Sequence, residues 1–227
     1  MDQISQSLIR QQCLVGGEWV GEPAVPVYNP ATGAIIARVP NLGAAETRQA
    51  IGAAAEALPA WSGLLAKERS AILRRWFELQ LAHAEELAQL LTAEQGKPLA
   101  EARGEISYGA SFVEFFAEEA KRVYGETIPT HKKDGRIIVH RQPIGVVGAI
   151  TPWNFPFAMI TRKVSPALAV GCTVVIKPAP DTPLTALALG ELAKQAGIPD
   201  GVLNIVTGDA EAIGRELTSN PTVRAIT

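Results

Sequence analysis

Residues 144–177, IGVVGAITPWNFPFAMITRKVSPALAVGCTVVIK, decide how this chain folds. The segment opens and closes on short β-branched runs, IGVVGAI and TVVIK, with a helical stretch between them. Two further runs of this kind, VLNIV (202–206) and VRAIT (223–227), continue the alternation. Strands that alternate with helices predict a parallel sheet with helices on its faces, in the order βαβαβαβ. Ligands of such sheets bind beyond the carboxyl ends of the strands.

Local signals for helix starts agree with this interpretation. Thr182 is expected to cap a helix whose first residue is Pro183, because a hydroxyl accepts from free backbone N–H groups and proline lacks one. Asp209 is expected to cap the following helix in the same way. The hydrophobic pattern and the residue chemistry at the helix ends therefore predict the same elements.

The residues before this core predict short strands at first. Residues 12–40 contain two turn signals, Gly16-Gly17 and Asn29 to Gly33, between short apolar runs. Residues 135–143, just before the core, alternate apolar and polar side chains. That alternation predicts a half-buried strand.

Helices are expected between these strands. Apolar residues recur at helical spacing over 44–57 and over 67–95. Gly96 and Pro98 end that pattern, and a further helix is expected to run to about Val123. These segments predict helices that pack against the sheet.

Composition excludes several classes of function. The formal net charge is −2, and Lys and Arg are scattered along the chain, so we expect no nucleic-acid partner. The beginning, MDQISQSLIRQQ, has no apolar signal core, and no run reaches the roughly 18 apolar residues of a membrane span. We therefore expect a cytoplasmic protein without a membrane partner. The two cysteines, Cys13 and Cys172, lie far apart and have no metal-ligand spacing.

Three polar segments follow the predicted strands directly: TPWN after the first, KPAPDT after the second and TGDA after the third. A parallel sheet brings these segments to one edge, although they lie far apart in the sequence. No GxGxxG fingerprint follows any of the strands. On residue pattern alone, the chain is an α/β domain with a candidate nucleotide site.

The same segments resemble a known family. ITPWNFP, ALAVGCTVVIKPA, TPLTALALGELAKQAGIPDGVLNIVTG and LTSNPTVRAIT are similar to the amino-terminal, cofactor-binding half of the NAD(P)-dependent aldehyde dehydrogenases. The likeness runs from about Leu14 to Thr227. LTAEQGKPLAEARGEISYGASFVEFFAEEAKRVYGETIP and WNFPFAMITRK resemble the succinate-semialdehyde dehydrogenases within that family most.

The resemblance implies a chemistry and a role for Asn154. In this family a cysteine thiolate attacks the aldehyde, hydride passes to the nicotinamide, and a glutamate helps water to hydrolyse the thioester. Asn154 matches the asparagine that stabilises the oxyanion, because its amide can donate to the developing negative oxygen. The alternative for Asn154 is a turn residue that caps the next helix.

The resemblance also implies a cofactor, NAD or NADP, and the residues that bind it. Lys177 matches the lysine that reaches the ribose hydroxyls or a 2′-phosphate. Pro180 stands where the family usually has Glu or Ser. A Glu accepts from the ribose 2′-OH and repels a 2′-phosphate, and a Ser can donate to that phosphate, whereas the side chain of Pro180 can do neither. NAD versus NADP thus stays open; the lack of a carboxylate at 180 favours tolerance of NADP, and Asp181 counts against it. The complete set of implied cofactor-binding residues is Ile150, Thr151, Pro152, Trp153, Asn154, Lys177, Pro178, Ala179, Pro180 and Gly208.

Two of these implied residues and Arg162 have plain structural alternatives. Arg162 matches the arginine that succinate-semialdehyde dehydrogenases direct at the substrate carboxylate, a suitable task for a planar cation with paired donors. Its alternative is a helix-surface arginine. Trp153 could be a packing residue and Gly208 a strand-end turn glycine.

The domain organisation follows from pattern and resemblance together. We expect a β-rich amino-terminal segment (1–43), a helical part of the cofactor-binding domain (44–134), a strand of an oligomerisation element (135–143) and a Rossmann-like core (144–227) that is incomplete at the carboxy terminus. The complete protein is expected to form a homo-oligomer and to act on a small-molecule aldehyde.

One expectation concerns activity. The sequence stops at Thr227, before the glutamate and the nucleophilic cysteine that the family uses, and neither Cys13 nor Cys172 fits the nucleophile's place. We therefore predict that this polypeptide alone cannot oxidise an aldehyde. The alternative function is an inactive module that binds a dinucleotide or assembles with complete subunits.

Overall fold

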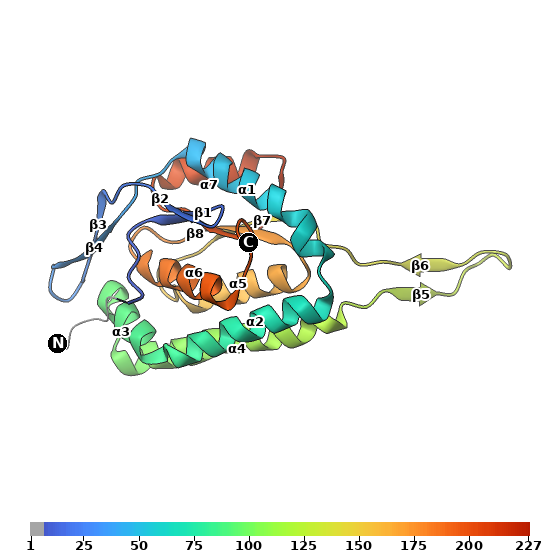
Figure 1. The fold of residues 1–227 in the computed structure, drawn as a ribbon, viewed down its shortest axis with the longest axis horizontal. Helices are drawn as coiled ribbons and strands as arrows, with labels where there is room; N and C mark the ends of the chain where they lie inside the picture. The colour runs from blue at the N-terminus through green and yellow to red at the C-terminus, as the bar shows by residue number, and fades with distance from the viewer. Residues whose placement is uncertain (1–6) are drawn as a thin grey trace.

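The computed structural model describes residues 7–227 and is built around one six-stranded sheet (Figure 1). Its strands lie in the order β10-β7-β8-β9-β1-β2. Their bounds are Val223–Ile226, Val146–Ile150, Thr173–Lys177, Leu203–Ile205, Cys13–Val15 and Glu18–Val20, in that order. The first four strands are parallel, and β1 and β2 continue the sheet in antiparallel pairing. The predicted α/β class with a parallel sheet and flanking helices is confirmed.

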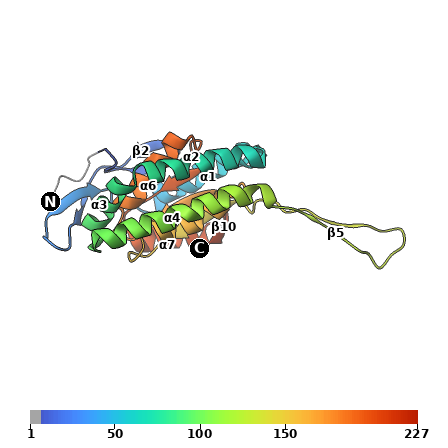
Figure 2. The ribbon, with the colours of Figure 1, turned by 90° about the horizontal axis from the view of Figure 1, so that it is seen from below.

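Helices cover both faces of this sheet (Figures 1 and 2). α1 and α7 lie on one face, and α5 and α6 lie on the other, where α2 and α4 form a further layer. α3 joins α2 to α4 and packs against α6. The helices are α1 (Ala44–Gly63), α2 (Ala66–Ala82), α3 (Ala84–Gln95), α4 (Leu99–Glu119), α5 (Ala158–Ala169), α6 (Leu184–Ala196) and α7 (Ala210–Ser219), with a short 3-10 turn at Ala120–Arg122.

The strand side chains divide between two apolar clusters because successive residues point to opposite faces. Val146 and Val175 pack with α1 and α7, whereas Val147, Val174 and Ile176 belong to the larger cluster under α5 and α6. Burial on both faces explains the continuous apolar runs from which the strands were predicted.

Two hairpins confirm the predicted turns. Gly16 and Gly17 join β1 to β2 with φ of 61° and 89°. A two-residue type I′ hairpin turn requires positive φ at both of its central residues. β3 (Val25–Tyr28) and β4 (Ile35–Val39) flank the second turn and form a separate two-stranded sheet.

The helical segments differ from prediction in two places. The segment 67–95 is two helices, α2 and α3, which meet at His83. α1 continues past the expected end at residue 57 to Gly63 and includes Pro59. Beyond Pro59, the buried Trp61 donates to the Leu168 carbonyl at 3.2 Å and holds the end of α1 against α5.

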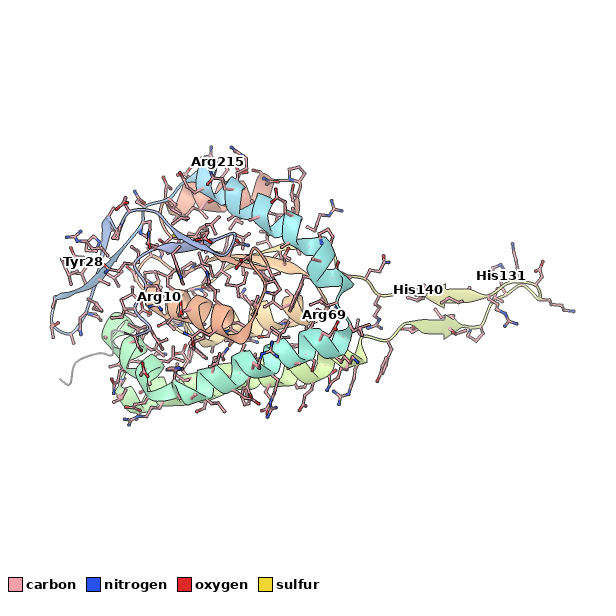
Figure 3. The ribbon with its side chains drawn as sticks, viewed as in Figure 1. Arg10, Tyr28, Arg69, His131, His140 and Arg215 are labelled. Carbon is pink, nitrogen blue, oxygen red and sulfur yellow. The ribbon has the colours of Figure 1, made fainter. Side chains whose placement is uncertain are left out.

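The strand expected to be half-buried over 135–143 is exposed. It is β6 (Ile137–Val139), which pairs only with β5 (Glu126–Ile128) within the described residues. The two strands form an arm that projects from the body, with His131 and His140 along it (Figure 3). Ile138 is 60% exposed because neither the sheet nor a helix covers the arm. The predicted strand is present over Ile137–Val139, but the expected half-burial was wrong. Alternation indicates that the two faces of a strand differ, and it does not indicate what packs against them.

One of the two predicted helix caps is confirmed. Asp209 accepts hydrogen bonds from the backbone N–H groups of Glu211 and Ala212, both at 3.0 Å. Thr182 does not cap α6, which begins at Leu184 after Pro183. A buried carboxylate from α3 takes that role instead, as described below.

The first six residues of MDQISQSLIRQQ, which also begin the predicted segment 1–43, lie outside the described residues. Within residues 7–227, no helix is both long enough and apolar enough to cross a membrane.

The contact between α4 and α5 depends on Gly109. A Cβ at this position would overlap the ring of Phe157, whereas a Cβ at Gly104, on the same helix, would meet open space. We expect Gly109→Ala to lower the free energy of unfolding by about 1–3 kcal/mol, a typical cost of overpacking. Gly104→Ala should raise it by about 0.5–1 kcal/mol through helix propensity. Urea unfolding of the native protein checks both, and equal effects would contradict this packing.

Candidate functional site

Three loops meet along the carboxyl edge of the parallel strands. They are residues 151–157 after β7, residues 178–183 after β8 and residues 206–209 after β9. Ile150 of β7 lies opposite Lys177 of β8, and the Thr151 backbone N–H donates to the Lys177 carbonyl at 3.1 Å. The predicted residues of the first two loops are thus neighbours in space.

The first loop presents polar and aromatic side chains to solvent. Trp153, Asn154 and Phe155 are exposed, as is Pro152, whereas Thr151 is buried. Asn154 does not cap α5, because the first N–H groups of that helix donate to a carboxylate of α4 instead. This rules out the capping alternative for Asn154.

Lys177, the last residue of β8, is buried where the second loop begins. Its side chain donates to the Pro178 carbonyl at 3.2 Å, and burial lowers its pKa. Ala179 is buried, and Pro180 and Asp181 are exposed. This contact uses one of the three N–H groups of the ammonium, so the other two can donate to a ligand that reaches this position.

A cavity of about 260 Å³ connects the first two loops. Its lining comes from both loops, the end of α3, β3 and the turn after β3: Trp153, Pro180, Asp181, Thr182, Glu94, Gln95, Pro26, Val27, Tyr28 and Pro30. Two predicted residues from different loops, Trp153 and Pro180, therefore share one cavity.

The third loop is tied to the amino-terminal segment. Leu42 pairs with Gly208, and its backbone exchanges hydrogen bonds with Thr207 and Asp209 at 3.0 and 2.9 Å. Gly208 has φ of 139°, and a Cβ there would overlap the Leu42 backbone. This close approach of two chain segments is a structural reason for the glycine.

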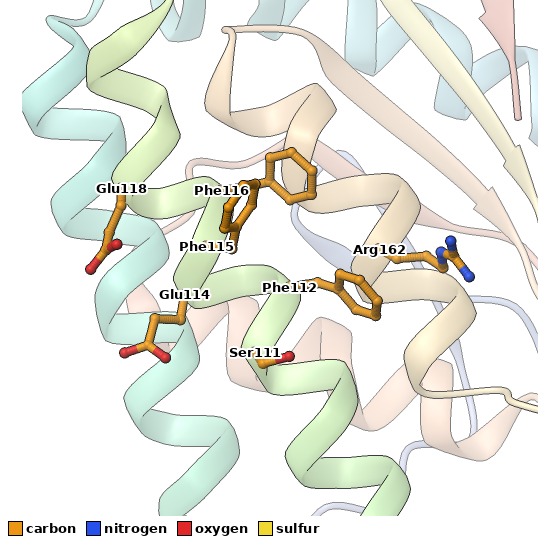
Figure 4. A pocket seen from close by; sticks show the side chains of 7 residues that line it. All are labelled: Ser111, Phe112, Glu114, Phe115, Phe116, Glu118 and Arg162. Atoms are coloured by element: carbon orange, nitrogen blue, oxygen red, sulfur yellow. The ribbon is translucent and has the colours of Figure 1, made fainter.

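Arg162 lies on the exposed side of α5 and does not line the cavity that Trp153 and Pro180 share. Its guanidinium carbon is 5.4 Å from the centre of the Phe112 ring, a cation–π contact. Both side chains line a cavity of about 780 Å³ that follows α4 (Figure 4), together with Ser111, Glu114, Phe115, Phe116 and Glu118. Within residues 7–227, Arg162 forms no ion pair.

Sequence reasoning missed the two buried glutamates that support the first two loops. Glu94 accepts hydrogen bonds from the backbone N–H groups of Leu184 and Thr185, each at 2.7 Å, and from the Thr185 hydroxyl. Glu105 accepts from the N–H groups of Phe157 and Ala158 at 2.9 and 3.2 Å. Each glutamate therefore caps the helix that follows one of the loops.

A signal for these glutamates was present in the sequence. Glu105 stands at helical spacing with Ala102, Ile106 and Gly109, on the buried stripe of α4. Glu94 continues the apolar stripe of α3 in the same way. An acid on the apolar face of a helix needs buried donors, and a helix N-terminus supplies them.

Neither cysteine has the environment of a nucleophile. Burial raises the pKa of the Cys13 thiol, and its sulfur accepts from the Thr207 backbone N–H at 3.2 Å. Cys172 is buried as well. In the described part of the chain, no group of three or more His, Cys, Asp or Glu side chains could hold a metal ion.

The parallel sheet with its loops at one edge defines a Rossmann-like α/β protein. Residues 19–227 match the family model described as "Aldehyde dehydrogenase family". The chain belongs to the aldehyde dehydrogenase family.

Several relatives are close in sequence and structure. A succinate-semialdehyde dehydrogenase [NADP(+)] of Escherichia coli is 63% identical over 97% of this chain and 46% of that protein. A glutarate-semialdehyde dehydrogenase of Pseudomonas aeruginosa is also 63% identical, with the same coverage of both chains. The crystal structure of an E. coli NADP dependent enzyme matches with a TM-score of 0.96 at 62% identity, over 98% of this chain and 47% of that one. The chain spans about half the length of the curated relatives it matches.

The buried Glu94 predicts a pH-dependent stability. Burial raises its pKa from 4.5 to about 7 in the folded protein. The unfolded chain therefore releases this proton at lower pH than the folded protein, and the stability that the protonated carboxyl contributes is lost between about pH 4.5 and 7. We expect the free energy of unfolding of the native protein to fall across this range relative to Glu94→Gln, by up to about 3 kcal/mol.

Urea unfolding at several pH values measures this difference. The control is Glu101→Gln, which makes the same change on the exposed side of α4. Because Glu101 lies in the first turn of that helix, we expect a difference from the native protein of at most about 0.3–1 kcal/mol. A difference between the native protein and Glu94→Gln that does not vary with pH would contradict the assignment.

Proposed function

We propose that this chain is the cofactor-binding half of an NAD(P)-dependent dehydrogenase that oxidises succinate semialdehyde, or a similar short carboxylated aldehyde, to the acid. The observation that carries the proposal is Asn154. Its side chain is exposed at the carboxyl end of β7 and is not used to cap α5. An amide at this edge is available to donate to the oxygen of a reacting aldehyde.

Two buried hydroxyls support binding of the cofactor at the first two loops. The hydroxyls of Thr151 and Thr182 are buried and make no hydrogen bond within the described chain, so each loop offers an unused polar atom. Lys177, Pro178 and Ala179 would hold the ribose side, and Ile150, Pro152 and Trp153 would lie along the cofactor. Bound NAD(P)⁺ supplies the hydride acceptor, while Asn154 stabilises the negative charge that develops on the substrate oxygen.

For the choice between cofactors, we propose that NADP is tolerated. No carboxylate stands at position 180 to repel a 2′-phosphate, although Asp181 is exposed beside it. The E. coli relative is named for NADP(+), which supports the same choice.

For the substrate, we propose that Arg162 binds its carboxylate. The guanidinium is exposed, has no ion-pair partner among the described residues and borders the cavity along α4. Two relatives are named for semialdehydes of dicarboxylic acids. A substrate of this kind carries the charge that an unpaired arginine recognises.

The second candidate function is non-catalytic. In it, residues 1–227 bind the dinucleotide or join subunits and do not themselves oxidise an aldehyde. The burial of Cys13 and Cys172 favours it, because a packed thiol cannot attack an aldehyde. The arm of β5 and β6 would serve assembly into a homo-oligomer, since Ile128, Ile137 and Ile138 are exposed along it.

Substitution of Asn154 tests the main proposal. In the native protein that contains this chain, Asn154→Ala should lower kcat by about 10²–10³, the usual cost of one oxyanion donor. Asn154→Asp, which replaces the donor by an acceptor, should lower it at least as much. Steady-state assays with NAD⁺ and NADP⁺ measure kcat, and fluorescence titration should give an unchanged cofactor Kd. Unchanged turnover in Asn154→Ala would refute the role.

The substrate role of Arg162 has a separate test. Arg162→Gln should lower kcat/KM for succinate semialdehyde by about 10- to 100-fold, the value of a charge-assisted hydrogen bond, and leave kcat/KM for butanal within about threefold. The control is Lys163→Gln, because the neighbouring cation already bonds to the Thr227 hydroxyl at 3.2 Å. Equal losses for both aldehydes would exclude a carboxylate contact.

A further inference from the structure

The loop that carries Asn154 is fastened by two residues from another part of the chain. Lys97, in the turn between α3 and α4, donates to the Asn154 backbone carbonyl at 3.0 Å. Glu105 of α4 accepts from the backbone N–H groups of Phe157 and Ala158 at 2.9 and 3.2 Å. The loop is therefore held at Asn154 and again where α5 begins.

Lys97 and Glu105 are also bonded to each other. The Lys97 ammonium forms an ion pair with the second carboxylate oxygen of Glu105, and the first oxygen caps α5. The ammonium also lies 4.3 Å from the centre of the Phe155 ring. One cation thus contacts the carbonyl of Asn154, the side chain of the next residue and the carboxylate that fixes the following helix.

Burial makes this arrangement rigid. The side chains of Lys97 and Glu105 are 9% and 1% exposed. A buried charge that loses its partner is strongly destabilised, so neither side chain can leave the other for solvent at small cost. Ion pairs on the surface, such as Arg103 with Glu85, have no such restraint, since both of their side chains are about half exposed.

The two attachment points restrict the backbone between them. Residues 154–157 span the distance from the Lys97 contact to the Glu105 contact, and Pro156 within this span has a fixed φ. The backbone sets the direction of the Asn154 Cα–Cβ bond, and with it the region that the amide can reach through its rotamers. An oxyanion donor is effective only when it is already oriented toward the place where charge develops.

We propose that Lys97 and Glu105 are positioning residues that fix the orientation of Asn154. This inference rests on the proposed function of Asn154 as the oxyanion donor. Neither residue contacts the substrate in this mechanism; Lys97 acts through the Asn154 carbonyl, and Glu105 acts through Lys97 and the start of α5.

The test is a double-mutant cycle in the native protein, with Lys97→Met, Asn154→Ala and the two combined. Lys97→Met should lower kcat by about 10- to 100-fold, because a shift of about 1 Å in a catalytic group can cost that much, and leave the cofactor Kd unchanged. In the Asn154→Ala background, the same change should lower kcat by less than about twofold, because the group that Lys97 positions is gone.

Two further variants keep the test informative. The charge-neutral pair Lys97→Met with Glu105→Gln leaves no isolated buried charge, retains an acceptor for α5 and should lower kcat as Lys97→Met does. This pair replaces the single variant if the single variant does not fold. Arg103→Met removes an exposed cation from α4 and should leave kcat within about twofold.

The outcomes separate the two proposals. Suppose that Asn154→Ala lowers kcat. The positioning role is then wrong if Lys97→Met leaves kcat unchanged, or if its effect is the same with Asn154 present and with Asn154 replaced by Ala. In either case the function of Asn154 stands. If Asn154→Ala leaves kcat unchanged, both proposals are overturned. A loss from Lys97→Met that disappears in the Asn154→Ala background supports both.

Discussion

The parallel register of β7 against β8 is the constraint on which the rest of the structure depends. With Ile150 opposite Lys177, the two strands end together, so their loops leave the sheet at one edge and Trp153 and Pro180 line a common cavity. Parallel strands also need a crossover helix between them. α5 and α6 supply two of these crossovers and bury one face of the sheet, whereas α7 supplies the crossover from β9 to β10 and covers the other face together with α1.

This arrangement creates a problem that the buried glutamates solve. α5 and α6 begin inside the protein, where their first N–H groups need acceptors. The loops before α5 and α6 end in proline and apolar residues and provide no capping side chain of their own. Glu94 and Glu105 reach these helix starts from α3 and α4. The side chains of the loops therefore stay available for ligands, and the outer helical layer becomes part of the site.

Local residue chemistry predicted the features whose causes are local. The hairpin turn at Gly16-Gly17 and the cap by Asp209 each depend on residues within four positions of one another. The predictions that were wrong concern distant partners. Thr182 has the right chemistry for a cap, but the first N–H groups of α6 donate to Glu94 instead. The alternation over 135–143 carried no information about whether anything covers that strand.

The sequence by itself determined the alternation of strands and helices, the resemblance to the aldehyde dehydrogenases and the identity of the candidate donor, Asn154. These follow from periodicity and from short contiguous motifs. Only the tertiary structure decided how that donor is held, because Lys97 and Glu105 precede it by about fifty residues and reach it through the packing of α4 against α5. Contacts between segments so distant depend on the three-dimensional path of the chain, which no local pattern specifies.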